Sequence, residues 1–116
     1  MSYTARSQWE GIRRLARVSI PDSAVSFTII DTALSNPVRQ IIVTNDTNAV
    51  IAFSVNNNGA NFELLPYSQF VSDIAANKQT NGSLFMSKGD ALYAGHVTAP
   101  TDGTGVSLAA MYGKGD

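Results

Sequence analysis

The side chains that could do chemistry are few and widely spaced along this chain. The sequence contains one histidine, His96, and no cysteine, so it offers no thiol nucleophile and no cysteine-based zinc site. A Ser-His-Asp relay needs a histidine that is placed by its partners, and no residue pattern around His96 marks such partners. His96 shares strand parity with Leu92 and Ala94, which favours a structural role.

Carboxylates are the second source of possible chemistry. Glu63 and Asp73 could in principle form the acid–base pair of a glycosidase, but nothing in the sequence places them together. Asp46 and Asp102 fall in expected turns, where aspartate is more often a turn former than a calcium ligand. The sequence also lacks the phosphate-binding glycine loops, the nucleophile elbow and the HExxH zinc motif. We therefore expect no enzyme activity, no catalytic or metal-binding residue and no cofactor.

Two asparagines begin a pattern that can accept a glycan. Asn45 and Asn81 each stand two residues before a threonine or serine, as an N-glycosylation acceptor requires. This short pattern arises often by chance, and the first residues lack the apolar stretch of a signal peptide. We interpret residues 45–48 and 81–82 as turns instead, because asparagine and glycine are common in turns.

Length and composition limit the class of protein. A chain of 116 residues with a net charge of −1 is expected to form one compact domain with its own core. No apolar run approaches the ~20 residues that a membrane helix needs, and the overall charge does not suggest a nucleic-acid-binding protein. We expect partners other than membranes or nucleic acid.

Charge is distributed unevenly along the chain. Residues 1–20 carry four arginines and one glutamate, a net charge of +3, whereas residues 21–116 carry four basic and eight acidic residues, a net charge of −4. We therefore divide the chain into a basic N-terminal arm, 1–20, and a body, 21–116. The arm either docks on an acidic neighbour or is simply a solvated basic surface.

Residues 7–16 have the pattern of a short helix. Ser7 and Glu10 have the spacing of a capping box, and Pro21 would end any helix soon afterwards. An apolar face follows at helical spacing and consists of Trp9, Ile12, Leu15 and Ala16. So short a helix needs a surface to pack on. Trp9 is the expected anchor, either on its own domain or in a pocket of a partner.

From residue 17 onward the chain has the pattern of an all-β protein. Short runs rich in Val, Ile, Phe and Thr alternate with turn-forming clusters, and no helical pattern lies between them. The expected strands cover residues 17–20, 25–30, 38–44, 49–55, 62–65, 69–75, 84–86, 91–98 and 106–112. The runs 38–44 and 49–55, joined by a short polar turn, are expected to pair as a hairpin. Eight or nine strands predict an antiparallel β-sandwich or a small barrel. The strand count favours a jelly-roll-like sandwich, and an immunoglobulin-like topology stays open as the alternative.

Aromatic side chains make binding more plausible than catalysis. Tyrosine and tryptophan combine an apolar ring with a polar group and suit interfaces. Tyr93 and Tyr112 fit the core or the sheet edges, whereas Tyr3 and Trp9 lie in the arm and are the better candidates for partner contacts. Exposed aromatics could instead stack on sugars, as in a carbohydrate-binding module.

Several strand and turn patterns give the body a family resemblance. Residues 36–47 (NPVRQIIVTNDT), 53–56 (FSVN), 62–66 (FELLP), 88–93 (KGDALY), 98–101 (TAPT) and 106–113 carry it. Over residues 25–113 the chain resembles small β-sandwich virion proteins of short-tailed bacteriophages. It is most similar to capsid cement, or decoration, proteins, which are small jelly-roll-like proteins that clamp neighbouring capsid subunits from outside the shell.

The resemblance implies a mechanical function. The protein would bind the major capsid protein on the virion exterior after assembly in the host cytoplasm, and it would self-associate as a dimer or trimer. Trp9 would supply an apolar contact, and Arg13, Arg14 and Arg17 would supply polar contacts to an acidic capsid surface. Two alternatives remain open: a collar or tail-fibre component of the virion, and a carbohydrate- or receptor-binding module.

Overall fold

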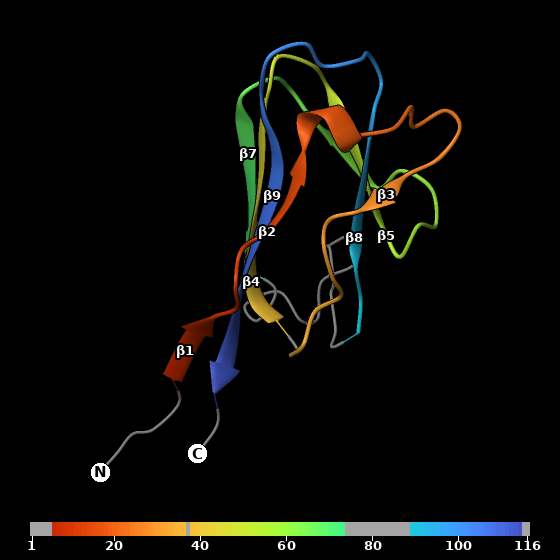
Figure 1. Cartoon of the computed structure of the whole chain (residues 1–116). Helices are drawn as coiled ribbons and strands as arrows, with labels where there is room; N and C mark the ends of the chain where they lie inside the picture. Colours follow the sequence, from red (N-terminus) through yellow and green to blue (C-terminus); the bar gives the residue numbers. More distant parts are fainter. Residues whose placement is uncertain (1–5, 37, 74–88, 115–116) are drawn as a thin grey trace.

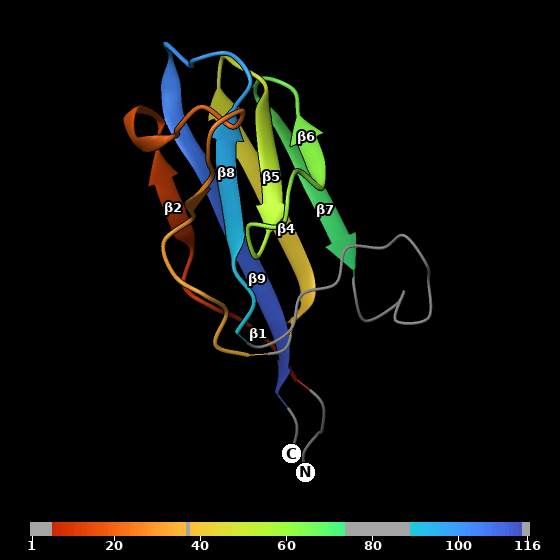
Figure 2. The same ribbon diagram turned by 90° about the vertical axis from the view of Figure 1, so that its right-hand side faces the viewer.

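Two antiparallel sheets packed face to face make up the protein (Figures 1 and 2). The computed structural model describes residues 6–36, 38–73 and 89–114, and in these ranges the chain forms strands and one 3₁₀ turn but no α-helix. The prediction of an all-β antiparallel sandwich is confirmed. The expected strand at 84–86 lies outside the described residues.

Sheet A has the strand order β1-β9-β4-β7, with β2 also paired to β9. Its strands are β1 (Arg6–Trp9), β2 (Arg13–Ala16), β4 (Val38–Thr47), β7 (Ser68–Asp73) and β9 (Gly103–Lys114). Sheet B has the order β3-β8-β5-β6. Its strands are β3 (Thr28–Ile29), β5 (Ile51–Val55), β6 (Phe62–Leu64) and β8 (Leu92–His96). With β1 and β2 as one interrupted edge strand, these two orders are those of a jelly roll.

The expected hairpin between residues 38–44 and 49–55 is wrong. β4 continues to Thr47 and belongs to sheet A, whereas β5 begins at Ile51 and belongs to sheet B. The short connection therefore crosses from one sheet to the other. Alternation along each strand shows that one face is buried, but it does not identify the neighbouring strand, which is why the pairing was missed.

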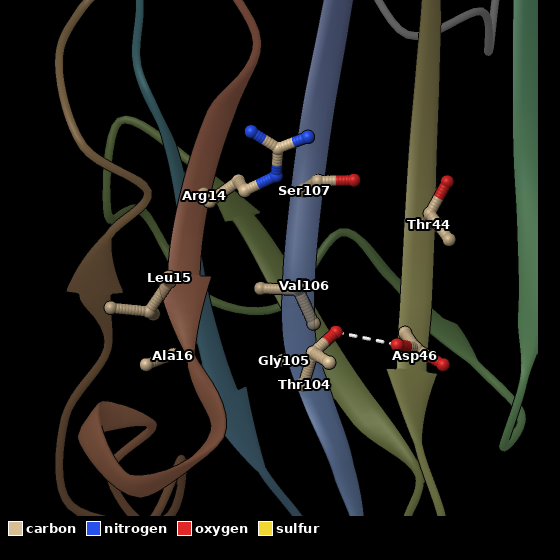
Figure 3. Close-up of a pocket in the computed structure, with 9 residues that line it drawn as sticks. All are labelled: Arg14, Leu15, Ala16, Thr44, Asp46, Thr104, Gly105, Val106 and Ser107. Carbon is tan, nitrogen blue, oxygen red and sulfur yellow. Dashed lines mark hydrogen bonds between the residues drawn. The ribbon is translucent and has the colours of Figure 1, made fainter.

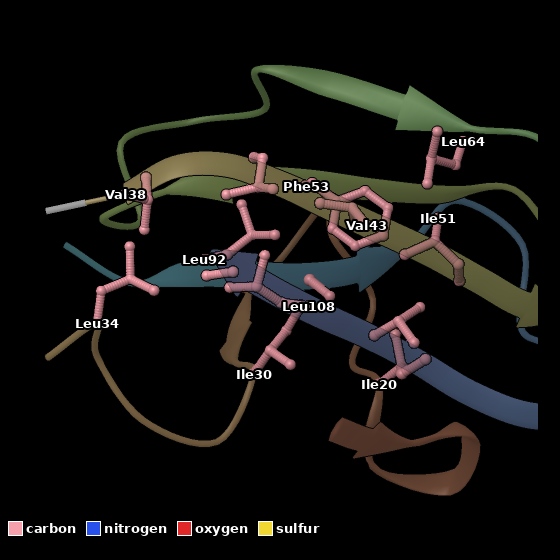
Figure 4. Packing of buried hydrophobic residues seen from close by; sticks show 14 residues of the cluster. Ile20, Ile30, Leu34, Val38, Val43, Ile51, Phe53, Leu64, Leu92 and Leu108 are labelled. Carbon is pink, nitrogen blue, oxygen red and sulfur yellow. The ribbon is translucent and has the colours of Figure 1, made fainter. Parts of the chain in front are cut away.

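The core lies between the sheets (Figure 4). Along β4, every second residue from Ile41 to Thr47 is buried, as the two-residue period of a half-buried strand requires. Phe62 joins the two layers at one side of the sandwich: its ring stacks on Phe53 of sheet B at 5.1 Å and meets Phe70 of sheet A at 4.9 Å. The completely buried large apolar side chains are Ile30, Ile41, Val43, Ile51, Phe53, Leu92 and Leu108.

The N-terminal segment is an edge strand, so the helix expected over residues 7–16 is wrong. Arg6–Trp9 pairs with the end of β9, and Arg13–Ala16 pairs with residues 105–108 in its first half. A 3₁₀ turn, Arg17–Ser19, follows where a strand was expected. A helix of this length containing Gly11 is marginal, whereas β9 offers a long edge with unpaired backbone groups. The described part of the proposed 1–20 arm thus belongs to the sandwich.

The start of β1 and the end of β9 form a two-stranded ribbon that extends beyond the body of the sandwich (Figure 1). β4 pairs with β9 only as far as the Val38–Tyr112 pair. Arg6 is paired with Lys114 at the tip of this ribbon. The ribbon contributes to the elongated shape of the molecule, which measures 51 × 27 × 21 Å. The two ends of the described chain therefore leave the molecule at the same tip.

Candidate docking face on the outer side of sheet A

The outer face of sheet A presents its side chains in rows that cross the strands. Directly opposed residues of antiparallel strands point to the same face, so the register of β2, β9, β4 and β7 defines which side chains are neighbours. One outward row consists of Ala109, Ile42 and Val71. The next outward row consists of Arg14, Ser107, Thr44 and Gln69. Apolar and polar side chains therefore occupy different parts of this face.

The apolar half of the face, as we define it, lies toward β1. Its members are Trp9, Ile12, Ile42, Val71, Ala109 and Met111. Trp9, Ile12 and Val71 are exposed by 49%, 51% and 53%. An almost wholly apolar hollow of about 270 Å³ lies here, lined by Trp9, Ile12, Ile42 and Ala109 together with Glu10. Large apolar side chains grouped on an open surface are typical of an interaction site.

The polar half of the same face lies toward the opposite end of β4. It surrounds an open hollow of about 500 Å³ with a mixed lining (Figure 3). Its polar side chains are Arg14, Thr44, Asp46, Thr104 and Ser107, and its apolar surface comes from Leu15, Ala16, Gly105 and Val106. The Thr104 hydroxyl donates a hydrogen bond to the Asp46 carboxylate. Arg14 extends from β2 over the neighbouring strand β9 (Figure 3). The outer face of sheet A therefore consists of an apolar half beside a polar half.

A β-bulge turns Ile12 onto this face. Trp9 lies opposite Met111 and Arg13 lies opposite Leu108, so three residues of the edge strand face only two residues of β9. The Glu10 N–H still donates to the Ala110 carbonyl at 2.8 Å. A bulge of this kind redirects side chains and bends the strand. It sends the carboxylate of Glu10 beneath the edge while Trp9 and Ile12 stay exposed.

The Arg13 guanidinium is buried beneath the bulge. Arg13 is exposed by only 6% and donates to the carbonyls of Thr32 and Ala33, both at 2.9 Å, and to that of Gly11 at 3.1 Å. It also donates to Glu10 Oε1 at 2.7 Å, forming an ion pair with both side chains almost fully buried. Arg13 thereby fastens the edge strand to the loop that precedes β4.

The Glu10 carboxylate is saturated with donors. Besides Arg13, it accepts hydrogen bonds from the backbone N–H groups of Ser35 and Asn36 and from the Asn36 amide. Burial by itself raises the pKa of Glu10, but the hydrogen bonds and the charge of Arg13 outweigh burial and hold the pKa below its usual value. The carboxylate is therefore ionised in the folded protein at neutral pH.

The four residues expected to contact a partner are separated by the strand geometry. Trp9 and Arg14 lie on the outer face of sheet A, as a contact role requires. Arg13 points inward, and this corrects the expectation for it: its donors are used within the chain. Arg17 is half-buried and donates from Nε to the Gly103 carbonyl at 2.9 Å. Alternation along β2 explains why adjacent arginines serve different purposes.

The sequence analysis missed the apolar members of the face other than Trp9. Ile42 lies between Ile41 and Val43, two buried residues, so the apolar run hides which side chain points outward. Ile12 was assigned to a helical face because the bulge breaks the two-residue period. Alternation along the strand expected at residues 69–75 could have indicated that Val71 points outward, because its neighbour Phe70 points to the core.

The candidates for catalysis stay apart. Glu63 is on β6 of sheet B and Asp73 is on β7 of sheet A, so the fold gives no support to a glycosidase pair. Within residues 6–36, 38–73 and 89–114, no group of three or more His, Asp or Glu side chains gathers as a metal site would require. In the same ranges, no helix is long and apolar enough to cross a membrane.

Comparisons with known proteins leave the geometry as the main guide to function. No protein-family model matches this chain, and no curated protein or solved structure matches it at a significant level. The resemblance to phage virion proteins therefore depends on the strand and turn patterns of residues 25–113.

Proposed function

We propose that this protein is a bacteriophage capsid cement protein that binds the outer surface of the shell and clamps neighbouring subunits of the major capsid protein. It acts by binding and catalyses no reaction. The observation that supports this most is the outer face of sheet A, where an apolar half with half-exposed Trp9, Ile12 and Val71 adjoins a polar half. Its place is the virion exterior, after assembly in the host cytoplasm, without direct contact to nucleic acid or membrane.

The size of the face suits one protein interface. β4 is 10 residues long and the sheet is four strands wide, so at about 3.4 Å per residue and about 4.8 Å between strands the face covers roughly 650 Å². A standard interface buries about 800 Å² on each partner. The face supplies most of this area, and the ribbon of β1 and β9 extends it.

The chemistry of the face suits a subunit seam. The energy of a protein interface concentrates in a few large side chains surrounded by contacts that exclude water. Trp9 and Ile12 border an apolar hollow that an apolar side chain of a capsid subunit would fill. Arg14 and Asp46 add one charge of each sign in the polar half. A partner with the complementary pair of charges is therefore held in one orientation, because charge complementarity sets the register of an interface.

Binding to purified expanded capsids tests this function. Ile12→Lys places an ammonium group in the apolar half, and we expect its affinity for capsids to fall at least tenfold in a co-sedimentation assay. Val25→Lys is the matched control, since Val25 is 82% exposed in the loop before β3, and it should bind as the unchanged protein does. Equal binding by Ile12→Lys, with an unchanged melting temperature, would overturn the assignment of this face.

Particle location separates this function from a collar or tail-fibre role. A cement protein is present in many copies over the whole shell, whereas a collar or fibre protein occupies one vertex, and immuno-electron microscopy of virions distinguishes the two.

A carbohydrate-binding role is less favoured by the geometry. Tyr67 lies beside Thr47 at the far end of sheet A from Trp9, and Tyr93 lies on sheet B. Among the described residues, Trp9 and Tyr112 are the aromatic side chains that line one hollow, so binding to a glycan array is the test of this alternative.

A further inference from the structure

The two sheets have four edges among the described strands, and three of them are protected against pairing with another strand. The β1–β2 edge is broken by the bulge at residues 10–12 and carries arginines. β3 has only two residues, and β6 has three and is followed by Pro66 after one residue. Bulges, positive charge, shortness and proline are the usual means by which sheets prevent edge-to-edge association.

The fourth edge, β7, has none of these features. Its six residues, SQFVSD, include no proline and no basic residue, and their only charge is at the last position. The pairing of β7 with β4 runs through six consecutive residue pairs without a register shift. Among the described residues no strand pairs with its other side. A regular, nearly uncharged edge of this length favours the addition of a further strand.

We propose that β7 pairs antiparallel with β7 of a second copy of this chain, about a two-fold axis at Val71. A two-fold axis brings identical edges together in antiparallel orientation, so the surface is complementary to itself. This pairing would join two copies of sheet A into one continuous sheet. Edge pairing extends the outer face of sheet A without covering it, so the proposal goes beyond the capsid-binding function, although Val71 contributes to both surfaces.

The register at Val71 follows from the side-chain pattern. Opposed residues must point to the same face, so the axis falls on a residue rather than between two. With the axis at Val71, the half-exposed Val71 side chains of both copies meet, and Gln69 falls opposite Asp73 of the second copy. Phe70 keeps its contact with Phe62 and falls opposite Ser72. The outward row of Ala109, Ile42 and Val71 then continues into the same row of the second copy.

The pairing buries a small area. Strands of this length bury less than the roughly 1,200 Å² of the smaller stable interfaces, so we expect a reversible dimer that forms with increasing protein concentration. Neighbouring copies held on a surface would be at high local concentration, where a modest affinity suffices.

A single introduced cysteine tests the proposal directly, because the chain has no other. In the proposed register the two residues at position 71 have Cα atoms about 4.5–5.5 Å apart, within the range that a disulfide spans. We expect full-length Val71→Cys to form a covalent dimer under mild oxidation at least ten times faster than Gln69→Cys. The two Gln69 positions would be four residues apart along the strands, roughly 13 Å, which a disulfide cannot span.

Sedimentation velocity supplies a second measurement without cysteine. Val71→Lys sets two ammonium groups opposite each other and should abolish the concentration-dependent dimer, whereas the matched Val25→Lys variant should retain it. Equal rates of cross-linking for Val71→Cys and Gln69→Cys, or a wild-type chain that stays monomeric at all concentrations, would overturn the proposal that β7 pairs with a second copy. Because Val71 also belongs to the apolar half of the docking face, capsid binding is judged on Ile12→Lys and not on Val71→Lys. Failure of the dimer therefore does not count against the cement function.

Discussion

At the scale of single residues, Asn45 links the two sheets. Its side chain is completely buried, and its amide nitrogen donates to the carbonyls of Ala49, Leu64 and Leu65 at 2.8, 3.1 and 3.0 Å. Its Oδ1 accepts from the N–H and the hydroxyl of Thr47. Buried polar groups without partners are costly, so Asn45 satisfies backbone where the chain crosses between sheets. The glycan-acceptor pattern at Asn45 is inaccessible in this fold.

Replacing Asn45 should destabilise the protein strongly. Asn45→Ala leaves the buried carbonyls of Ala49 and Leu64, the partly buried carbonyl of Leu65 and the Thr47 N–H without this partner. We expect the free energy of unfolding to fall by about 2–3 kcal/mol. Asn58→Ala, in an exposed turn, is the matched control and should change it by less than about 0.5 kcal/mol. Urea unfolding measures both. Similar losses of unfolding free energy for Asn45→Ala and Asn58→Ala would contradict the role of Asn45 in linking the two sheets.

The Glu10–Arg13 pair predicts a specific pH dependence. Because the pKa of Glu10 is lowered on folding, its contribution to stability is present above the ordinary glutamate pKa and is lost as the pH falls through the folded-state pKa. Glu10→Gln should cost about 3 kcal/mol at pH 7, since it leaves the Arg13 charge buried without its partner. Urea unfolding at a series of pH values from 7 to 3 should show that the difference in unfolding free energy between wild type and Glu10→Gln becomes smaller as the pH falls.

Glu63→Gln is the control for this pH series, because Glu63 is exposed on the edge strand β6. Its stability should follow the wild-type curve at every pH. A difference between Glu10→Gln and wild type that stays constant down to pH 3 would show that the charge of Glu10 does not contribute through Arg13.

At the scale of strands and turns, the sequence predicts more of the fold than of the docking face. Alternation and turn clusters correctly indicate most strands of the body and the antiparallel β-sandwich, because one-sided burial requires a period of two, but they do not give the order of the strands in each sheet. The same rule could not reveal β1 and β2. There the bulge shifts the period, and Trp9, Ile12 and Leu15 by chance fall at helical spacing. Strand pairing depends on contacts distant in sequence, so the expected hairpin of residues 38–55 also failed.

Two glycines of β9 let its neighbouring strands β2 and β4 approach it closely. Gly103 and Gly105 of β9 have φ of 98° and 135°, in the region that side chains disfavour. A Cβ on Gly105 would lie 2.1 Å from the Leu15 carbonyl oxygen, and a Cβ on Gly103 would lie 2.0 Å from that of Asp46. The backbones of β2 and β4 therefore approach β9 at positions where only glycine fits.

Gly105→Ala should separate β2 from this end of β9. We expect a loss of at least about 2 kcal/mol in the free energy of unfolding, because strain in φ adds to the backbone clash. Gly11→Ala is the matched control, since a Cβ at Gly11 meets nothing within 4 Å. Hydrogen exchange should show faster exchange in β2 for Gly105→Ala alone. Unchanged protection of β2 would contradict this packing.

At the scale of the whole molecule, residues 6–16 are part of the domain and not a detachable arm. They form the edge of sheet A, and Arg13 fastens this edge to the loop before β4. Leu15 packs on the hydrophobic core from this edge. The basic character of this segment thus serves the fold at Arg13 and the surface at Arg14.

Deletion of residues 1–17 therefore tests the fold before it tests binding. We expect the shortened chain to lose cooperative thermal unfolding or to aggregate, because removal of the edge exposes β9 and the core beneath it. Circular dichroism melts and light scattering provide the measurement. A truncated protein with the wild-type melting temperature would show that the segment is a separate arm.

The shared tip of the ribbon has a mechanical consequence. A pulling force applied between the two ends of the described chain acts on the Arg6–Lys114 pair first and would unzip β1 from β9 one pair at a time. A force entering through the middle of sheet A instead loads β4 along its ladders with both β9 and β7, and many hydrogen bonds must shear at once. The fold therefore resists a force directed along the strands of sheet A more strongly than a force applied at the shared tip, where residue pairs open one at a time.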